Sequence, residues 1–208
     1  MDSQRRPSEA WISSSESEDE SEADEPEILA TTPYSKITAL RSAAIAKKRL
    51  YAGHHPPHYP RRELAIHELL KEVQLRDPSD VSRHVIPLLS FDVFSNGQIA
   101  LDFPLMETDL RDVYTERKEE ITKDVALRSL MVQRFLEILS ALQWIHELGI
   151  IHRDVNPSNI LLSRDLEKPA YLADFGVSWI DEYPDNKEEK IIKYSSGVGT
   201  GYLFPRHD

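Results

Sequence analysis

The strongest constraint on the fold is a change in the spacing of apolar residues near residue 105. Before this point, short apolar runs alternate with polar turns, at residues 27–32, 36–40, 43–51, 84–94 and 98–105. Runs of this kind predict β-strands. Between the third and fourth runs, residues 61–75 have the spacing of one helical face, with apolar residues at Ile66, Leu69, Leu70 and Val73. The first half therefore predicts five strands and one helix, with a hairpin turn at Ser95, Asn96 and Gly97.

After residue 105 the apolar spacing becomes helical. Residues 129–147 form the longest periodic segment, and Gly149 ends it. Its apolar stripe consists of Met131, Phe135, Ile138, Leu139, Leu142 and Ile145. Two short strand-like runs follow, NILL at 159–162 and AYLA at 170–173. A strand-rich first part and a helix-rich second part predict an α+β protein with two lobes.

Composition excludes several classes of protein. The chain has a net charge of -11, but ten acidic residues lie within the first 30 positions, so the remainder is only mildly acidic and has no basic surface for nucleic acid. It has no cysteine, which excludes a disulfide framework and a thiolate metal site. The first residues lack an apolar signal core, and no apolar run approaches the ~18 residues that span a bilayer. We expect a cytosolic or nuclear protein that binds neither nucleic acid nor membrane.

Two polar segments, residues 13–27 and the histidine–proline run at 54–58, say little about function. Residues 13–27 combine serines with acidic residues and are expected to be disordered, as a solubilising tail or, at Ser13, Ser14 and Ser15, as targets of an acid-directed kinase. His54, His55 and His58 suggest a metal site, but the prolines between them and the lack of nearby acids favour a solvated loop.

The chemistry lies in two motifs after the long helix. His152 begins the run HRDVNPSNILL, and DFG follows at residues 174–176. In this order and at this separation, the pair resembles the catalytic loop and the metal-binding motif of protein kinases. The resemblance covers roughly residues 28–208. It implies a bilobal fold, with a small β-rich N-lobe and an incomplete helical C-lobe, that uses ATP and Mg²⁺.

The resemblance assigns roles within these motifs. Phosphoryl transfer needs positioning and charge neutralisation, so Asp154 is the candidate catalytic base, and Asn159 and Asp174 are the candidate Mg²⁺ ligands. The alternative is that Asp154 and Asn159 only cap turns, as these residue types often do. Ser/Thr kinases usually have lysine two residues after the catalytic aspartate, where this chain has Asn156. Asparagine can donate a hydrogen bond to phosphate but brings no charge, so slower turnover is expected. The PSN run at 157–159 resembles the Ser/Thr type.

Upstream, Ile45, Ala46, Lys47 and Lys48 resemble the strand that carries the phosphate-binding lysine. Lys48 is the candidate, with Lys47 as the alternative register. Its partner should be a glutamate near the buried face of the following helix. Glu63 lies about 70° from the apolar stripe and Glu68 about 150°. Glu63 is therefore the expected partner, against the alternative that either glutamate is only a solvated surface residue.

The phosphate-covering loop departs most from the family. Residues 29–37, LATTPYSKI, resemble this loop although they contain no glycine. Ala30, Thr32 and Ser35 hold the three glycine places, with Tyr34 at the tip. Because glycine lets backbone amides approach phosphates closely, this sequence implies weaker nucleotide contacts.

Residues 101–110, LDFPLMETDL, resemble the hinge of cyclin-dependent kinases and their fungal activating-kinase relatives. The resemblance implies that Phe103 is the gatekeeper, that the carbonyl of Pro104 and the backbone of Met106 contact adenine, and that Asp109 bonds the ribose. It also implies nucleotide contacts at Ile37, Asn156, Ser158 and Leu161.

The segment VGTGYLFPRHD at 198–208 resembles the close of an activation segment, with Thr200, Tyr202 and Pro205 retained and Arg206 in the usual place of glutamate. Arg153, which precedes the catalytic aspartate, implies control by a phosphate on this segment. The candidate acceptors are Ser195, Ser196 and Thr200. Alternatively, Glu188 and Glu189 supply a permanent negative charge.

We therefore expect three parts: a disordered acidic tail at 1–27, a kinase N-lobe at 28–104, and a partial C-lobe at 105–208 that is truncated at the activation segment. The expected function is an ATP-dependent protein Ser/Thr kinase with a protein substrate and a cyclin-like or other regulatory partner. The alternative is a truncated or pseudokinase-like binding module, which Asn156 and the glycine-free loop favour. A small-molecule phosphotransferase would not explain the activation-segment motif.

Overall fold

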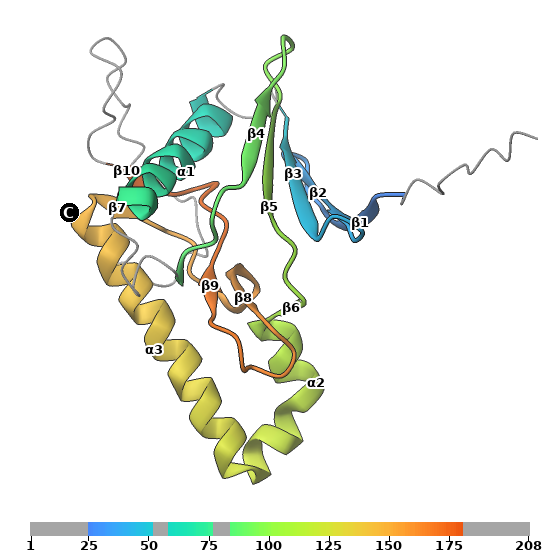
Figure 1. Ribbon diagram of the computed structural model, residues 1–208, viewed down its shortest axis with the longest axis vertical. Coiled ribbons are helices and arrows are strands. Elements are labelled where there is room, and N and C mark those ends of the chain that lie inside the picture. Colours follow the sequence, from blue (N-terminus) through green and yellow to red (C-terminus); the bar gives the residue numbers. More distant parts are fainter. Residues whose placement is uncertain (1–24, 52–57, 77–83, 181–208) are drawn as a thin grey trace, which may run out of the picture.

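The computed structural model describes residues 25–51, 58–76 and 84–180 (Figure 1). In these ranges a five-stranded antiparallel sheet with one helix is followed by two helices and two small sheets, which confirms the predicted α+β class. Several predicted features lie outside the described residues: Ser13, Ser14, Ser15, His54, His55, Glu188, Glu189 and the activation-segment positions from Ser195 to Arg206.

The large sheet has the strand order β1-β2-β3-β5-β4. Its strands are β1 (Glu27–Thr31), β2 (Ser35–Leu40), β3 (Ile45–Leu50), β4 (Ser90–Val93) and β5 (Ile99–Pro104). Glu27, where the first strand is expected to begin, pairs with Ala39 in the sheet. The β4–β5 turn is the predicted one, and Gly97 adopts a positive φ of 79° there.

The predicted strand at 84–94 is wrong in its first half. Val85 forms a parallel bridge with Leu172, and the N–H of Ile86 donates to the Leu172 carbonyl over 3.0 Å. Pro87 follows and has no N–H for a ladder. Val85 is buried in the apolar cluster of the second part, whereas Ile86 and Leu88 are buried in the cluster of the sheet, and β4 begins only at Ser90.

Helix α1 (His58–Arg76) lies beside the sheet and confirms the predicted helix (Figure 1). Its residues belong to two apolar clusters. Leu64 packs with sheet residues such as Leu101, whereas Ile66 and Leu70 pack with the residues of the second part. Because α1 contacts both clusters, residues 62–67 are all buried. Glu63 is one of these buried residues, so its carboxylate lies in the interior.

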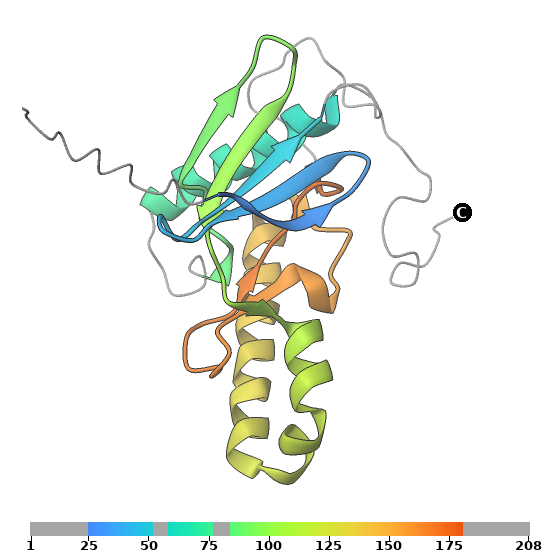
Figure 2. The same cartoon turned by 90° about the vertical axis from the view of Figure 1, so that its right-hand side faces the viewer.

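Helices α2 (Leu110–Lys123) and α3 (Val125–Glu147) form a hairpin that extends away from the sheet (Figure 2). Asp124 joins them: its side chain accepts the N–H groups of Ala126 and Leu127, and its own N–H donates to Glu120. The small strands are β6 (Thr108–Asp109), β7 (Ile150–Ile151), β8 (Ile160–Leu162), β9 (Tyr171–Leu172) and β10 (Trp179–Ile180). Within the described ranges, no helix has the length and apolar character that crossing a membrane requires.

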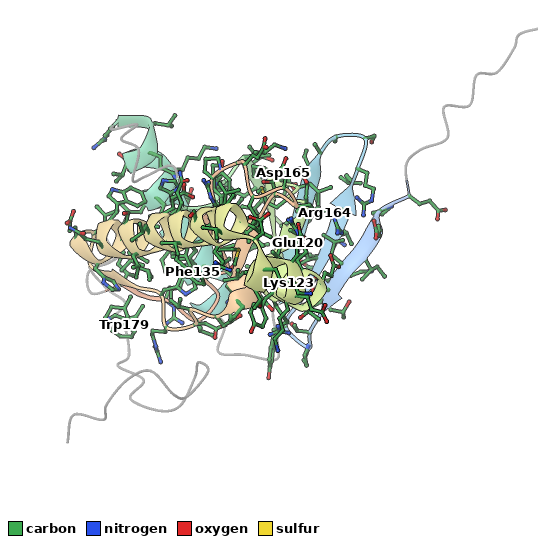
Figure 3. The ribbon with its side chains drawn as sticks, turned by 90° about the horizontal axis from the view of Figure 1, so that it is seen from below. Glu120, Lys123, Phe135, Arg164, Asp165 and Trp179 are labelled. Carbon is green, nitrogen blue, oxygen red and sulfur yellow. The ribbon has the colours of Figure 1, made fainter. Side chains whose placement is uncertain are left out.

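Two residues of the expected apolar stripe of α3 are exposed. Phe135 and Leu139 are 47% and 60% exposed, and Figure 3 shows Phe135 on α3 as seen from below. The buried face is Leu127, Met131, Arg134, Ile138, Ala141, Trp144 and Ile145. Apolar residues occur around most of this helix, so the contact with β7, β9 and α2 decides which of them become buried.

Candidate active site

Lys48 joins the sheet to two distant segments. It lies on β3, and its Nζ is 2.7 Å from Oε1 of Glu63 on α1 and 2.8 Å from Oδ1 of Asp174. Lys48 is 7% exposed and Glu63 is 3% exposed. A buried ammonium between two carboxylates is the arrangement in which each charge offsets the cost of burying the others.

The structure also distinguishes between the two candidate lysines and between the two candidate glutamates. Lys47 points to the other face of the sheet, where its Nζ lies 3.3 Å from Asp102 on β5. Glu68 is exposed on α1. The structure therefore places Lys48 and Glu63, and not Lys47 or Glu68, in the expected ion pair.

Burial and the ion pairs act in opposite directions on these three groups. Burial by itself lowers the pKa of Lys48, but Glu63 and Asp174 outweigh it and raise this pKa above its usual range. Burial raises the pKa of Glu63, and Lys48 opposes that change. The Lys48 charge lowers the pKa of Asp174 to about 2, so this carboxylate is ionised at neutral pH.

Asp174 occupies a sharp turn with a φ of 65°. Its Oδ1 accepts the N–H of Gly176 over 3.0 Å as well as the Lys48 ammonium. Its Oδ2 accepts no hydrogen bond from the described residues, and its side chain is 44% exposed. A Cβ on Gly176 would lie 3.0 Å from Asp174 Oδ1 and 3.3 Å from Glu63 Oε2, so only glycine fits here without displacing the carboxylates.

Asn159 and Asp154 are held together in the loop before β8. The Nδ2 group of Asn159 donates to the Asp154 carbonyl over 2.8 Å and to Asp154 Oδ2 over 3.0 Å. Both partners are acceptors, so the amide nitrogen is identified and Oδ1 of Asn159 is turned away without a hydrogen bond in the described part. A free carboxylate oxygen on Asp174 and a free amide oxygen on Asn159 are the hard ligands that Mg²⁺ prefers, so these residues fit the ion.

His152 connects this loop to the segment that precedes Asp174. Its Nδ1 accepts the N–H of Asp154 over 3.3 Å, so its Nε2 carries the proton and donates to the Ala173 carbonyl over 3.0 Å. Burial lowers the pKa of His152, which favours this neutral form. Ser178 donates to the carbonyl of His152 over 2.9 Å and adds a second connection.

His67 and Phe175 complete the interior of the site, and sequence reasoning missed both, together with His152. The fully buried Phe175 ring lies 4.8 Å from the His152 ring and 5.2 Å from the His67 ring. His67 also lies 4.8 Å from the ring of Phe103. Burial lowers the pKa of His67 to about 3, so this imidazole is neutral. Its position four residues after Glu63 was the available signal, because such residues share a helix face.

The side chain of Asn156 makes hydrogen bonds within its own loop, which its expected role did not include. Its Oδ1 accepts the N–H of Ser158 over 2.9 Å, and its Nδ2 donates to the Asp154 carbonyl over 3.2 Å. It is the N-cap of the short helix η2 (Pro157–Asn159). The side-chain amide is thus used within the loop, and its contact with phosphate stays a prediction.

The residues expected to hold the base and ribose lie between the sheet and α2. Met106 and Leu161 pack against the sheet cluster that contains Phe103, and within the described part the backbone N–H and C=O of Met106 make no hydrogen bond. Pro104 ends β5, and Asp109 is the N-cap of α2 through one carboxylate oxygen. On the other side, Ile37 is paired with Ala30 and Lys48 in the sheet, and Thr32 lies in the β1–β2 turn.

Comparison with known proteins gives several matches. Residues 34–205 match the protein kinase domain family. Serine/threonine-protein kinase csk1 of Schizosaccharomyces pombe is 40% identical over 67 residues, 32% of this chain and 21% of that protein. Serine/threonine-protein kinase PknH of Mycobacterium tuberculosis is 36% identical over 124 residues, 59% of this chain and 18% of that protein. Mitogen-activated protein kinase 15 of Caenorhabditis elegans is 32% identical over 116 residues, 52% of this chain and 23% of that protein. The matched segments thus span about a fifth of each relative's length.

Proposed function

Because this chain belongs to the protein kinase domain family, we propose that it transfers the γ-phosphate of ATP to serine or threonine hydroxyls of a protein substrate, with Mg²⁺. The observation that carries the proposal is the contact of Lys48 with both Glu63 and Asp174, which lie 15 and 126 residues away in the sequence. This contact joins the sheet, α1 and the segment after β9 at one point.

Each residue then has a task in the transfer. Lys48 has three N–H groups and uses two for the carboxylates, so one remains for a phosphate oxygen of the nucleotide. Asp174 and Asn159 would hold the Mg²⁺, which supplies the charge neutralisation that phosphoryl transfer requires. Asp154 takes the proton of the acceptor hydroxyl as the new oxygen–phosphorus bond forms and the bond to ADP breaks. Asn159 donates one hydrogen bond to the Asp154 carboxylate and one to the Asp154 backbone carbonyl, and together these bonds orient the carboxylate for this task.

Two finer assignments belong to the same proposal. The PSN run at 157–159 and relatives that are named serine/threonine-protein kinases support Ser/Thr specificity. The hinge residues 101–110 support membership of the cyclin-dependent-type group, and with it a cyclin-like regulatory partner.

A second candidate is a non-catalytic, nucleotide- or partner-binding module. It is favoured by Asn156, whose amide is used within its own loop at the position where a lysine is usual.

Phosphate transfer from labelled ATP to a mixed basic protein substrate, with Mg²⁺, tests the proposal on the full chain. We expect transfer by the wild type and a loss of roughly a thousandfold in Asp154→Ala. Asp165→Ala is the matched control, because Asp165 is exposed on the β8–β9 turn. Transfer by Asp154→Ala at the wild-type rate would refute the proposed mechanism. A wild type that binds ATP but transfers no phosphate would establish the second candidate instead.

A further inference from the structure

The β1–β2 turn, residues 32–35, uses all of its own backbone N–H groups. The N–H of Thr32 donates to the Ser35 carbonyl over 2.8 Å. The N–H groups of Tyr34 and Ser35 both donate to Oγ1 of Thr32, over 3.2 and 2.9 Å. Pro33 has no N–H. We call this arrangement the closed turn, because each of its amide donors already has a partner within the turn.

The closed turn lies next to the ionic cluster of the site. In the sheet, Ile37 is paired with Lys48 and Ser35 is paired with Leu50. Side chains alternate along a strand, so Ser35 and Ile37 are on the same face as Lys48. Two residues of strand correspond to about 7 Å, a separation that the phosphate chain of a nucleotide can bridge.

The loop before β8 also uses part of its polar groups locally. Asn156 accepts the N–H of Ser158 and donates one of its two side-chain N–H groups to the Asp154 carbonyl. The β1–β2 turn therefore presents none of its amide donors to a terminal phosphate, while Asn156 and Lys48 each retain one N–H. Two isolated donors of this kind do not replace the row of backbone N–H groups that an open turn would offer to a third phosphate.

We propose that Thr32 is a specificity-determining residue: its hydroxyl keeps the β1–β2 turn closed, so the site binds ADP about as tightly as ATP. This inference rests on the nucleotide site of the proposed function. A third phosphate adds negative charge without gaining a backbone donor, whereas an open turn would offer the N–H groups of Tyr34 and Ser35 as charge-assisted hydrogen bonds.

Calorimetric titration of the full chain with adenosine, ADP and a non-hydrolysable ATP analogue, each with Mg²⁺, tests the proposal. For the wild type we expect ADP and the analogue to bind within about threefold of each other. Thr32→Val keeps the shape of the side chain but removes the acceptor oxygen. We expect it to bind the analogue about tenfold more tightly and adenosine unchanged, since a hydrogen bond to a charged group is worth about one such factor. Thr32→Ser keeps an acceptor and should preserve the ADP-to-analogue ratio of the wild type.

Amide hydrogen exchange without nucleotide reports on the turn itself. We expect the amides of Tyr34 and Ser35 to exchange at least about tenfold faster in Thr32→Val than in the wild type. Thr122→Ala, which removes an exposed hydroxyl on α2, is the matched control and should change neither measurement. Equal exchange, or an unchanged ADP-to-analogue ratio in Thr32→Val, would overturn the proposal. Binding of all three ligands by a protein that transfers no phosphate would refute the catalytic proposal and leave this one standing.

Discussion

The turns at Thr32 and Asp174 share one local hydrogen-bonding motif but differ in whether they leave a side-chain oxygen free for another partner. In each, a side-chain oxygen accepts the N–H two residues ahead: Thr32 Oγ1 from Tyr34, and Asp174 Oδ1 from Gly176. The Thr32 hydroxyl finds its other partners within four residues. Asp174 instead pairs with Lys48, 126 residues away, and keeps a second oxygen free of hydrogen bonds in the described part. The same local motif thus uses the whole side chain within one turn and leaves a carboxylate oxygen free in the other, and the distant partner makes the difference.

Replacing Asp174 by asparagine keeps the hydrogen bond to Gly176 but removes the ion pair with Lys48. This substitution should have the largest effect on phosphate transfer. The amide oxygen can still accept the Gly176 N–H, but the negative charge that pairs with Lys48, and that the proposed Mg²⁺ site would need, is lost. We expect phosphate transfer to fall by roughly a hundredfold to a thousandfold while the Gly176 amide stays protected from hydrogen exchange. Asp165→Asn is the control, because Asp165 accepts the N–H of Glu167 in the same type of turn. If transfer stays at the wild-type rate in Asp174→Asn, the long-range ion pair is not what distinguishes this turn.

Glu63→Gln tests how much the ion pair between Lys48 and Glu63 contributes to the stability of the fold. It leaves the buried Lys48 with one carboxylate, and breaking a buried ion pair costs about 3 kcal/mol. We expect the free energy of unfolding, measured by urea denaturation, to fall by about this amount. Glu68→Gln changes the same chemistry on an exposed face of α1 and should alter it by less than about 0.5 kcal/mol. Equal losses in the two variants would show that the contact at Lys48 does not support the fold.

Between pH 7 and pH 5, the pH dependence of stability gives a smaller, graded effect. The pKa of His67 is lowered by burial from 6.5 to about 3, so the folded protein holds this imidazole neutral beside Lys48, Phe103 and Phe175. The unfolded chain takes up the proton below pH 6.5 and the folded chain does not. Stability from this group is therefore complete above pH 6.5 and falls by about 1.4 kcal/mol per pH unit on acidification towards pH 3.

Urea denaturation of His67→Leu at pH 7, 6 and 5 checks this expectation. The variant should lose less stability between pH 7 and pH 5 than the wild type does, whatever its stability at pH 7. His146→Gln, at an exposed position of α3, should follow the wild-type slope. Parallel slopes for His67→Leu and the wild type would mean that His67 is not held neutral in the folded protein.

Local sequence patterns predicted much of the fold. The five strands before residue 105, the helix at α1 and the turn at Gly97 follow from apolar spacing and turn chemistry. Helix α2 was not predicted, because its sequence LRDVYTERKEEITK is mostly charged and has only a few apolar positions. The apolar stripe of α3 includes the exposed Phe135 and Leu139, because apolar spacing alone does not say which residues of a stripe meet a neighbour.

The sequence by itself selected the candidate residues: motif resemblance and helix phase point to Lys48, Glu63, Asp154, Asn159 and Asp174. Only the tertiary structure decided how their polar atoms are used. It paired Lys48 with two carboxylates, oriented the Asn159 amide by two acceptors, and used the Asn156 and Thr32 side chains within their own loops. The physical reason is that each hydrogen-bonding atom has few partners, and the competition between a local and a distant partner is settled only when the chain has folded.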